Sequence, residues 1–172
     1  GSDFSRFRQN RIIIANRLAK SRGIPTSDNI NTFPSGYSKN QQDVIIASFY
    51  SAYTGSDPSN VSLNPIKNIP IPNWNIRYTG LMNNKSIRKL FNRFSLSHGY
   101  RSSYTINQFQ SNLDYNPSQP EQKNQYGDYL SDILFGNINL VEQFNPLIRL
   151  DIELKNSLKI LTELKTDRSL SL

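Results

Sequence analysis

Strict alternation between Phe94 and Phe109 is the feature that most constrains how this chain of 172 residues can fold. One parity is mostly apolar or aromatic (Phe94, Leu96, His98, Tyr100, Ser102, Tyr104, Ile106, Gln108), and the other is mostly polar. Because successive strand side chains point to opposite faces, this pattern predicts a strand with one apolar face and one polar, water-exposed face. It would run about 45 Å, whereas strands of globular domains usually have about five or six residues. The length favours a segment of a large antiparallel barrel.

A second alternating stretch runs from Ile148 to Leu164. A step of two residues advances about 200° around a helix and would scatter these apolar residues, so strands are favoured. A three-residue turn at Lys155–Ser157 keeps Leu154 opposite Leu158 and the apolar faces in register, whereas a two-residue turn would mix them. Residues 167–168 are expected to begin another turn, and the chain ends as SLSL resumes the alternation, as a slice of a barrel would.

The first 56 residues are expected to form a helical insert. Apolar residues recur at helical spacing from Phe4 to Leu18, and Gly23 with Pro25 would stop that helix. A second helix is predicted from a capping box of Ser38 and Gln41. Its apolar stripe is followed by Gly55 at the C-cap position, and the stripe consists of Val44, Ile45, Ser48, Phe49, Ala52 and Tyr53.

The remaining chain divides into a Pro-rich extended linker at 57–72 and an antiparallel β segment at 73–172, with loops at 80–92 and 116–146. A first strand is predicted at Trp74–Tyr78, and about two helical turns precede Phe94. Weaker patterns suggest a return strand over 108–115 and a short helix over 130–134.

Composition narrows the class of protein. The net charge is +7, cysteine is absent, and mean hydropathy is −0.57. No stretch approaches the roughly 18 apolar residues of a transmembrane helix, and thiolate metal sites and disulfides are excluded. A basic run occupies the first helix, but no nucleic-acid-binding motif accompanies it, so we expect a solvated helix face and no nucleic-acid partner. The run consists of Arg6, Arg8, Arg11, Arg17, Lys20 and Arg22.

Candidate chemistry is sparse. His98 is the sole histidine and lies on the apolar parity without a nearby acid, so we interpret it as a structural strand residue. Asp128 and Asp132 would face one another on a helix, but this spacing is common by chance. We therefore expect no catalytic residue, cofactor or metal, and a hydrolase is disfavoured. The residues expected to serve the wall or lumen of a barrel are Trp74, Tyr78, His98, Tyr100, Arg101 and Tyr104.

Several uncommon strings occur in a characteristic order. They read FPSGYSKNQQDVIIASFYSAYTG, IPIPNW, YTGL, SLSHGYRSSY, SNLDY, FNPLIRLDIELKNSL and KTDRSLSL. These motifs resemble the SprA-type outer-membrane translocon of the type IX secretion and gliding motility machinery. The resemblance covers nearly the whole chain, but proteins of that family are more than ten times longer, so this chain would be a segment. Residues 1–2 are expected to be a remnant of cloning.

The resemblance implies a location in the cell outer membrane and a role in a channel that exports folded cargo proteins. The partners it implies are secreted cargo proteins, a PorV-like outer-membrane barrel, a periplasmic plug protein and outer-membrane lipid. The helical insert would then lie in a loop domain or in the lumen, away from hydrocarbon.

A soluble extracellular β-rich module that binds glycan or protein through exposed aromatics is the alternative. The two readings differ in the apolar strand parity, which a soluble module would cover with its helices and a barrel would leave open to lipid.

Overall fold

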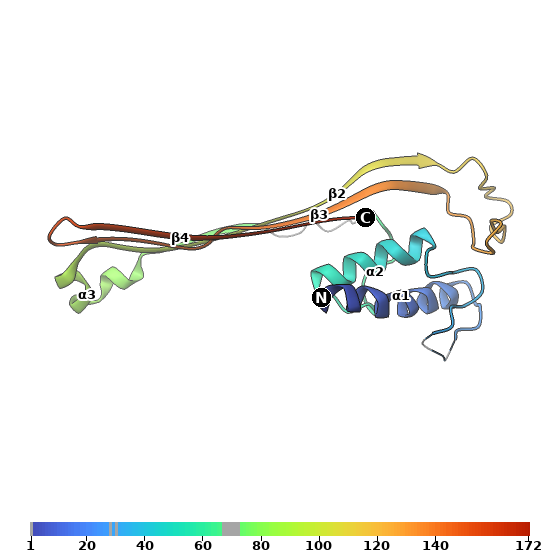
Figure 1. Cartoon of the computed structure of the whole chain (residues 1–172), viewed down its shortest axis with the longest axis horizontal. Coiled ribbons are helices and arrows are strands. Elements are labelled where there is room, and N and C mark those ends of the chain that lie inside the picture. The colour runs from blue at the N-terminus through green and yellow to red at the C-terminus, as the bar shows by residue number, and fades with distance from the viewer. Residues whose placement is uncertain (1, 28, 30, 67–72) are drawn as a thin grey trace. The chain divides into compact units, whose positions relative to one another are not determined.

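The computed structural model describes residues 2–27, 29, 31–66 and 73–172 and is mainly β, with one four-stranded antiparallel sheet and a few helices (Figure 1). The chain forms two compact units. Unit 1 comprises residues 1–69, 106–138 and 172, and unit 2 comprises residues 70–105 and 139–171. The two longest strands contribute to both units. In unit 2 they form most of the sheet. Their remaining parts belong to unit 1, together with two helices and a loop.

The strands lie in the sheet in the order in which they follow in the chain, β1-β2-β3-β4. Their bounds are Trp74–Tyr78, Phe91–Ser111, Ile133–Leu154 and Lys159–Ser171. β2 has 21 residues and β3 has 22, which confirms the prediction of unusually long strands. A 3-10 helix, Gly80–Asn83, and α3, Lys85–Leu90, connect β1 to β2, so the helical turns predicted before the long strand are present.

The predicted separation of two faces is present in unit 2. Trp74 pairs with Tyr100, and Tyr78 pairs with Leu96, so the even-numbered residues of β1 and β2 share one face. Ile148 pairs with Leu164 between β3 and β4, and these residues continue the even-numbered set. We call this even-numbered side of the unit 2 sheet the apolar face and the odd-numbered side the polar face.

The turn between β3 and β4 has the predicted length. The Leu154 amide donates to the Leu158 carbonyl at 2.9 Å, so three residues, Lys155–Ser157, form the turn. Ser157 has a φ of 68°, which is the left-handed position that three-residue hairpin loops require. The strands therefore continue with Ile152 opposite Ile160, and the apolar residues stay on one face.

Unit 1 is built around α1, Ser2–Ser21, and α2, Gln42–Thr54, which pack against one another. Small residues of α1 allow a close approach. One buried cluster consists of Ala15, Ala19, Tyr37, Val44 and Tyr129, and a second consists of Ile14, Ala47 and Val61. Gly55 ends α2 with a φ of 70°, as predicted. The predicted capping box is wrong in detail, because α2 is capped by Gln41, whose side chain accepts from the Val44 amide at 3.2 Å.

Three other expectations fail. No helix forms at 130–134, where β3 begins at Ile133, within the stretch expected as a loop at 116–146. No separate return strand forms over 108–115, because β2 itself continues to Ser111. β4 runs through Asp167 and Arg168 without a turn. Tertiary pairing decides the parts that enter strands, at 108–111, 133–134 and 167–168, because the local pattern does not reveal their partner strands. Of the expected linker, residues 57–66 form turns without a strand, and 67–72 lie outside the described residues.

Candidate functional site

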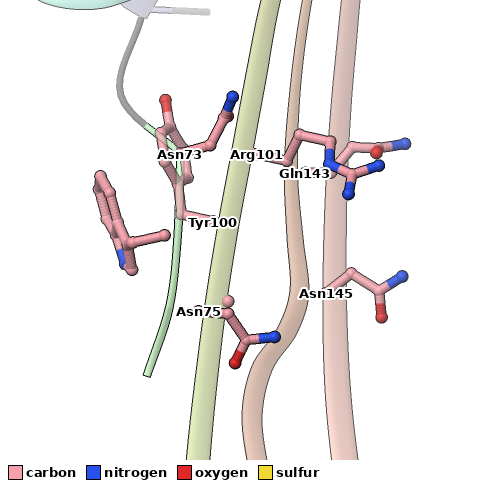
Figure 2. Close-up of a pocket in the computed structure, with 8 residues that line it drawn as sticks. Asn73, Asn75, Tyr100, Arg101, Gln143 and Asn145 are labelled. Carbon is pink, nitrogen blue, oxygen red and sulfur yellow. The ribbon is translucent and has the colours of Figure 1, made fainter. Parts of the chain in front are cut away.

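The polar face of unit 2 carries a hollow of about 360 Å³. Figure 2 shows Arg101 from β2 beside Gln143 from β3, with Asn145 further along the same strand. Asn73 and Asn75 border the hollow from the β1 side. Amide side chains donate and accept hydrogen bonds along an extended polypeptide, and a guanidinium donates them, so this surface is chemically suited to transient polar contacts.

A register shift in β3 shapes the hollow. It lies between Phe144 and Ile148, and it brings the Asn145 backbone against β2. Gly99 faces it, since a Cβ added there would lie 2.8 Å from the Asn145 carbonyl oxygen. Only a residue without a side chain fits at this distance. The predicted strand motif around Gly99 therefore contains a packing requirement that alternation alone did not reveal.

The same irregularity accounts for His98. Its Nδ1 lies 2.7 Å from the Leu147 carbonyl oxygen. Its ring lies 6.3 Å from that of Trp74 and 6.0 Å from that of Phe144, measured between centroids. A histidine placed beside a backbone carbonyl and two aromatic rings is suited to fixing strand geometry, and the structural role of His98 stays a prediction.

An aromatic and ionic cluster lies on the apolar face. The Tyr100 ring is 4.5 Å from Trp74 and 4.9 Å from Phe144, and its hydroxyl donates to Glu142 Oε1 at 2.9 Å. Arg168 donates from Nε to Glu142 Oε2 at 2.9 Å, and its Nη2 contacts the same oxygen. Sequence analysis missed Glu142 and Arg168. The sequence feature that could have revealed them is that both charged residues occupy even-numbered positions, which are otherwise mostly apolar in these strands.

The other predicted candidates are spread along the same strands. Tyr78 is exposed on the apolar face opposite Leu96, and Tyr104 is half-buried on β2 beyond Tyr100. Arg101 is exposed on the polar face. The structure therefore brings Trp74, His98 and Tyr100 together.

Ion pairs occupy the polar face of unit 2. Arg93 Nη2 lies 3.0 Å from Asp151 Oδ1 and 3.8 Å from Glu153 Oε2. Lys165 Nζ lies 3.7 Å from Glu163 Oε2. Exposed pairs of this kind contribute little to stability, typically about 0–1 kcal/mol each. Their consequence is a hydrated surface that carries both signs of charge.

Asp128 does not form a pair with Asp132, because that segment is not helical. Its carboxylate instead accepts from the Ser38 amide at 2.7 Å and from the Ser38 hydroxyl at 2.8 Å. Asp128 is only 7 % exposed. The residue therefore joins the loop before α2 to the loop before β3 and is structural within unit 1.

Three residues of the basic run, two on α1 and Arg22 just after it, also have a structural role. Arg17 donates to the carbonyls of Pro58 and Val61, both at 2.7 Å. Arg11 donates to the Lys39 carbonyl at 3.3 Å, and Arg22 donates to the Pro120 carbonyl at 2.9 Å. These arginines therefore hold loops of unit 1 against α1.

A cationic pair surrounds one buried tyrosine of unit 1. The Arg22 guanidinium carbon lies 4.4 Å from the centre of the Tyr129 ring, and Lys123 Nζ lies 4.7 Å from it. Tyr37 packs against Tyr129 at 5.4 Å. Burial raises the pKa of the Tyr37 hydroxyl above its ordinary value of 10.0, and Arg22 opposes this shift.

A second hollow, of about 410 Å³, lies in unit 1. Tyr126 at its edge is 78 % exposed. Asn124 contributes to its wall, but its side-chain oxygen already accepts from the amides of Tyr126 and Asp128. The polar groups of this hollow therefore serve partly to hold its own loop.

Within the described ranges, no set of three or more metal-binding side chains comes together. None of the helices described is long and apolar enough to cross a membrane. No protein-family model matches the chain, and no curated protein matches it either.

Proposed function

We propose that this chain is a wall segment of an outer-membrane protein-conducting channel of the SprA type, through which folded cargo proteins are exported. The mechanism is passive enclosure. The apolar face of unit 2 contacts lipid, the polar face lines the aqueous path, and unit 1 lies outside the hydrocarbon. The wall itself performs no chemical step in this mechanism.

The observation that carries the proposal is the exposure of the apolar face. Ile148 is 53 % exposed and Leu164 is 55 % exposed, although both lie in the middle of long strands. A large exposed apolar patch marks an interaction with lipid or protein rather than with water. Ile76, Tyr78, Leu96 and Ile160 are exposed on the same face.

The length of the strands supports lipid over a protein partner. Transmembrane strands need about 9–11 residues when tilted, and β2 and β3 exceed this length. Ordinary strands of soluble sheets have only about five or six residues. Residues alternate between an apolar and a polar face as they do in transmembrane barrels.

Export through such a channel would bring cargo against the polar face. Neighbouring residues offer a matched test of this geometry, because Arg149 and Ile148 are adjacent in β3 and belong to opposite faces. A photo-crosslinking amino acid is introduced at each position in the whole protein, in the cells that produce it.

The variant at Arg149 should form crosslinks to proteins bound for the cell surface, and the variant at Ile148 should not. Mass spectrometry identifies the captured proteins, and an export-blocked strain should increase their yield. Equal capture at both positions, or capture at Ile148 alone, would contradict the proposal.

A second candidate function, binding of a glycan, is favoured by one observation. Tyr126 projects at the edge of the unit 1 hollow, and exposed tyrosines are typical contacts for ligands with an apolar and a polar side. Titration calorimetry with cell-surface polysaccharide tests this candidate, and Tyr126→Ala should abolish any heat of binding.

A further inference from the structure

A charged pair interrupts the apolar face of β3 and β4 at one defined row, and beyond it Leu140, which pairs with Leu170, is buried at 1 % exposure. Five successive rows, counted from the hairpin turn, each contain at least one apolar side chain. We call these five rows the apolar band. They are Leu154–Leu158, Ile152–Ile160, Leu150–Thr162, Ile148–Leu164 and Phe144–Thr166.

The sixth row, Glu142–Arg168, contains no apolar residue. Its two side chains are joined by the contacts from Nε and Nη2 of Arg168 to Glu142 Oε2. A charged pair is disfavoured in hydrocarbon but is stable where water and polar headgroups are present. The sixth row is therefore the first level of this face that cannot lie among acyl chains without a penalty.

Aromatic residues mark the same level on β1 and β2. The Tyr100 ring packs between Trp74 and Phe144, while its hydroxyl donates to Glu142. One end of this tyrosine thus belongs to the apolar band and the other end to the ion pair. Tryptophan and tyrosine accumulate at membrane interfaces because they have this divided character.

The dimensions of the band agree with a bilayer. From Leu158, which directly precedes β4, to Arg168 the chain extends about 33 Å at roughly 3.3 Å per residue. With the tilt of about 40° that is usual for membrane barrels, this corresponds to about 25 Å along the membrane normal. That height equals the apolar band of about 25 Å in outer-membrane barrels. The opposite end of the band is closed by the polar turn Lys155–Ser157.

We infer, on the basis of the proposed function, that phospholipid covers the apolar band and that the membrane boundary lies at the Glu142–Arg168 row. Trp74 and Tyr100 lie at headgroup level, and the hairpin turn lies at the other boundary. The portion of β2 beyond Ser102 then extends outside the hydrocarbon, which explains why β2 is longer than a membrane crossing requires.

Trp74 is the only tryptophan of the chain and serves as a natural depth probe. The full chain is reconstituted in phosphatidylcholine vesicles that carry bromine either near the headgroup or near the acyl-chain ends. Bromine quenches tryptophan fluorescence only at close range. We expect Trp74 to be quenched at least twofold more strongly by the shallow bromine than by the deep bromine.

Two further probes are placed in a Trp74→Phe background. The Thr162→Trp variant places the probe in the third row of the band, and deep bromine should quench it most. The adjacent Leu161→Trp variant is the matched control, because Leu161 lies on the polar face at the same level. Its fluorescence should respond to aqueous iodide and not to brominated lipid.

The outcomes separate the two proposals. Stronger quenching of Trp74 by deep bromine would overturn the assigned boundary but would not contradict the proposed function. The same holds if lipid does not quench Trp74 while it quenches the Thr162→Trp variant. Quenching of all three probes by iodide and of none by lipid would overturn the proposed function itself. The Trp74 measurement uses the unaltered chain, so it does not depend on whether a variant folds.

Discussion

Replacing Asp128 by alanine should selectively loosen unit 1. The carboxylate accepts two hydrogen bonds from Ser38, at 2.7 and 2.8 Å, across 90 residues of sequence. Hydrogen bonds to charged groups contribute about 1.5–3 kcal/mol each, and a buried amide left without a partner adds to the loss. Because water can enter the neighbouring hollow, we take the lower part of this range for each bond and expect a loss of about 3 kcal/mol.

Native-state hydrogen exchange measures this loss locally. The Tyr129 amide donates to the Gly36 carbonyl at 3.0 Å and lies next to Asp128, so its exchange reports the opening of this contact. A loss of about 3 kcal/mol corresponds to roughly a 100-fold faster exchange, at about 1.4 kcal/mol per tenfold. Ser38→Ala removes only the hydroxyl bond and should accelerate exchange about tenfold.

Asp132→Ala is the control, because Asp132 is exposed and lies four residues further along the chain. It should change Tyr129 exchange by less than threefold. If Asp128→Ala and Asp132→Ala had equal effects, the bridge to Ser38 would not hold the two loops together. The assignment of Asp128 as structural would then be refuted.

Three further predictions concern the backbone and one buried hydroxyl. Gly99→Ala should destabilise unit 2 by about 1–3 kcal/mol through the clash with the Asn145 carbonyl, whereas Ser97→Ala should be nearly neutral in denaturant titrations; equal midpoints would contradict the close approach. Ser157→Gly should stabilise the hairpin by roughly 1 kcal/mol, because its φ of 68° strains a residue with a side chain, and a lower melting temperature would argue against this. The raised pKa of Tyr37 means that the folded state keeps a proton that the unfolded state loses above about pH 10.0. The free energy of unfolding should therefore fall as pH rises through this range, and Tyr37→Phe should remove that part of the fall.

Much of the sheet could be predicted from the sequence because alternation is a local property. Each side chain of a strand points opposite to its neighbours, so the order of apolar and polar residues from Phe94 to Gln108 already defines two faces. The same argument predicted the three-residue turn, since only that length keeps Leu154 opposite Leu158. The stop at Gly55 is equally local, because only a few residues tolerate the left-handed conformation at a helix end.

The candidate sites depended on contacts between distant residues, and these were not visible in the pattern. The bond between Asp128 and Ser38, the arginines that hold loops against α1, and the Glu142–Arg168 pair each join separate segments. The spacing of Asp128 and Asp132 suggested a helical pair, but this segment is not helical and β3 begins directly after it, at Ile133. A residue's neighbours in sequence do not reveal which carbonyl or carboxylate will be close in space.

By itself, the sequence determined that long strands form and that each has an apolar and a polar face, because both properties follow from the geometry of an extended chain. Only the tertiary structure decided where the register shifts at Phe144–Ile148, why Gly99 is required there, and at which row charge replaces apolar side chains. Those features arise when strands are placed side by side, since register and close approach belong to pairs of segments and not to either segment alone.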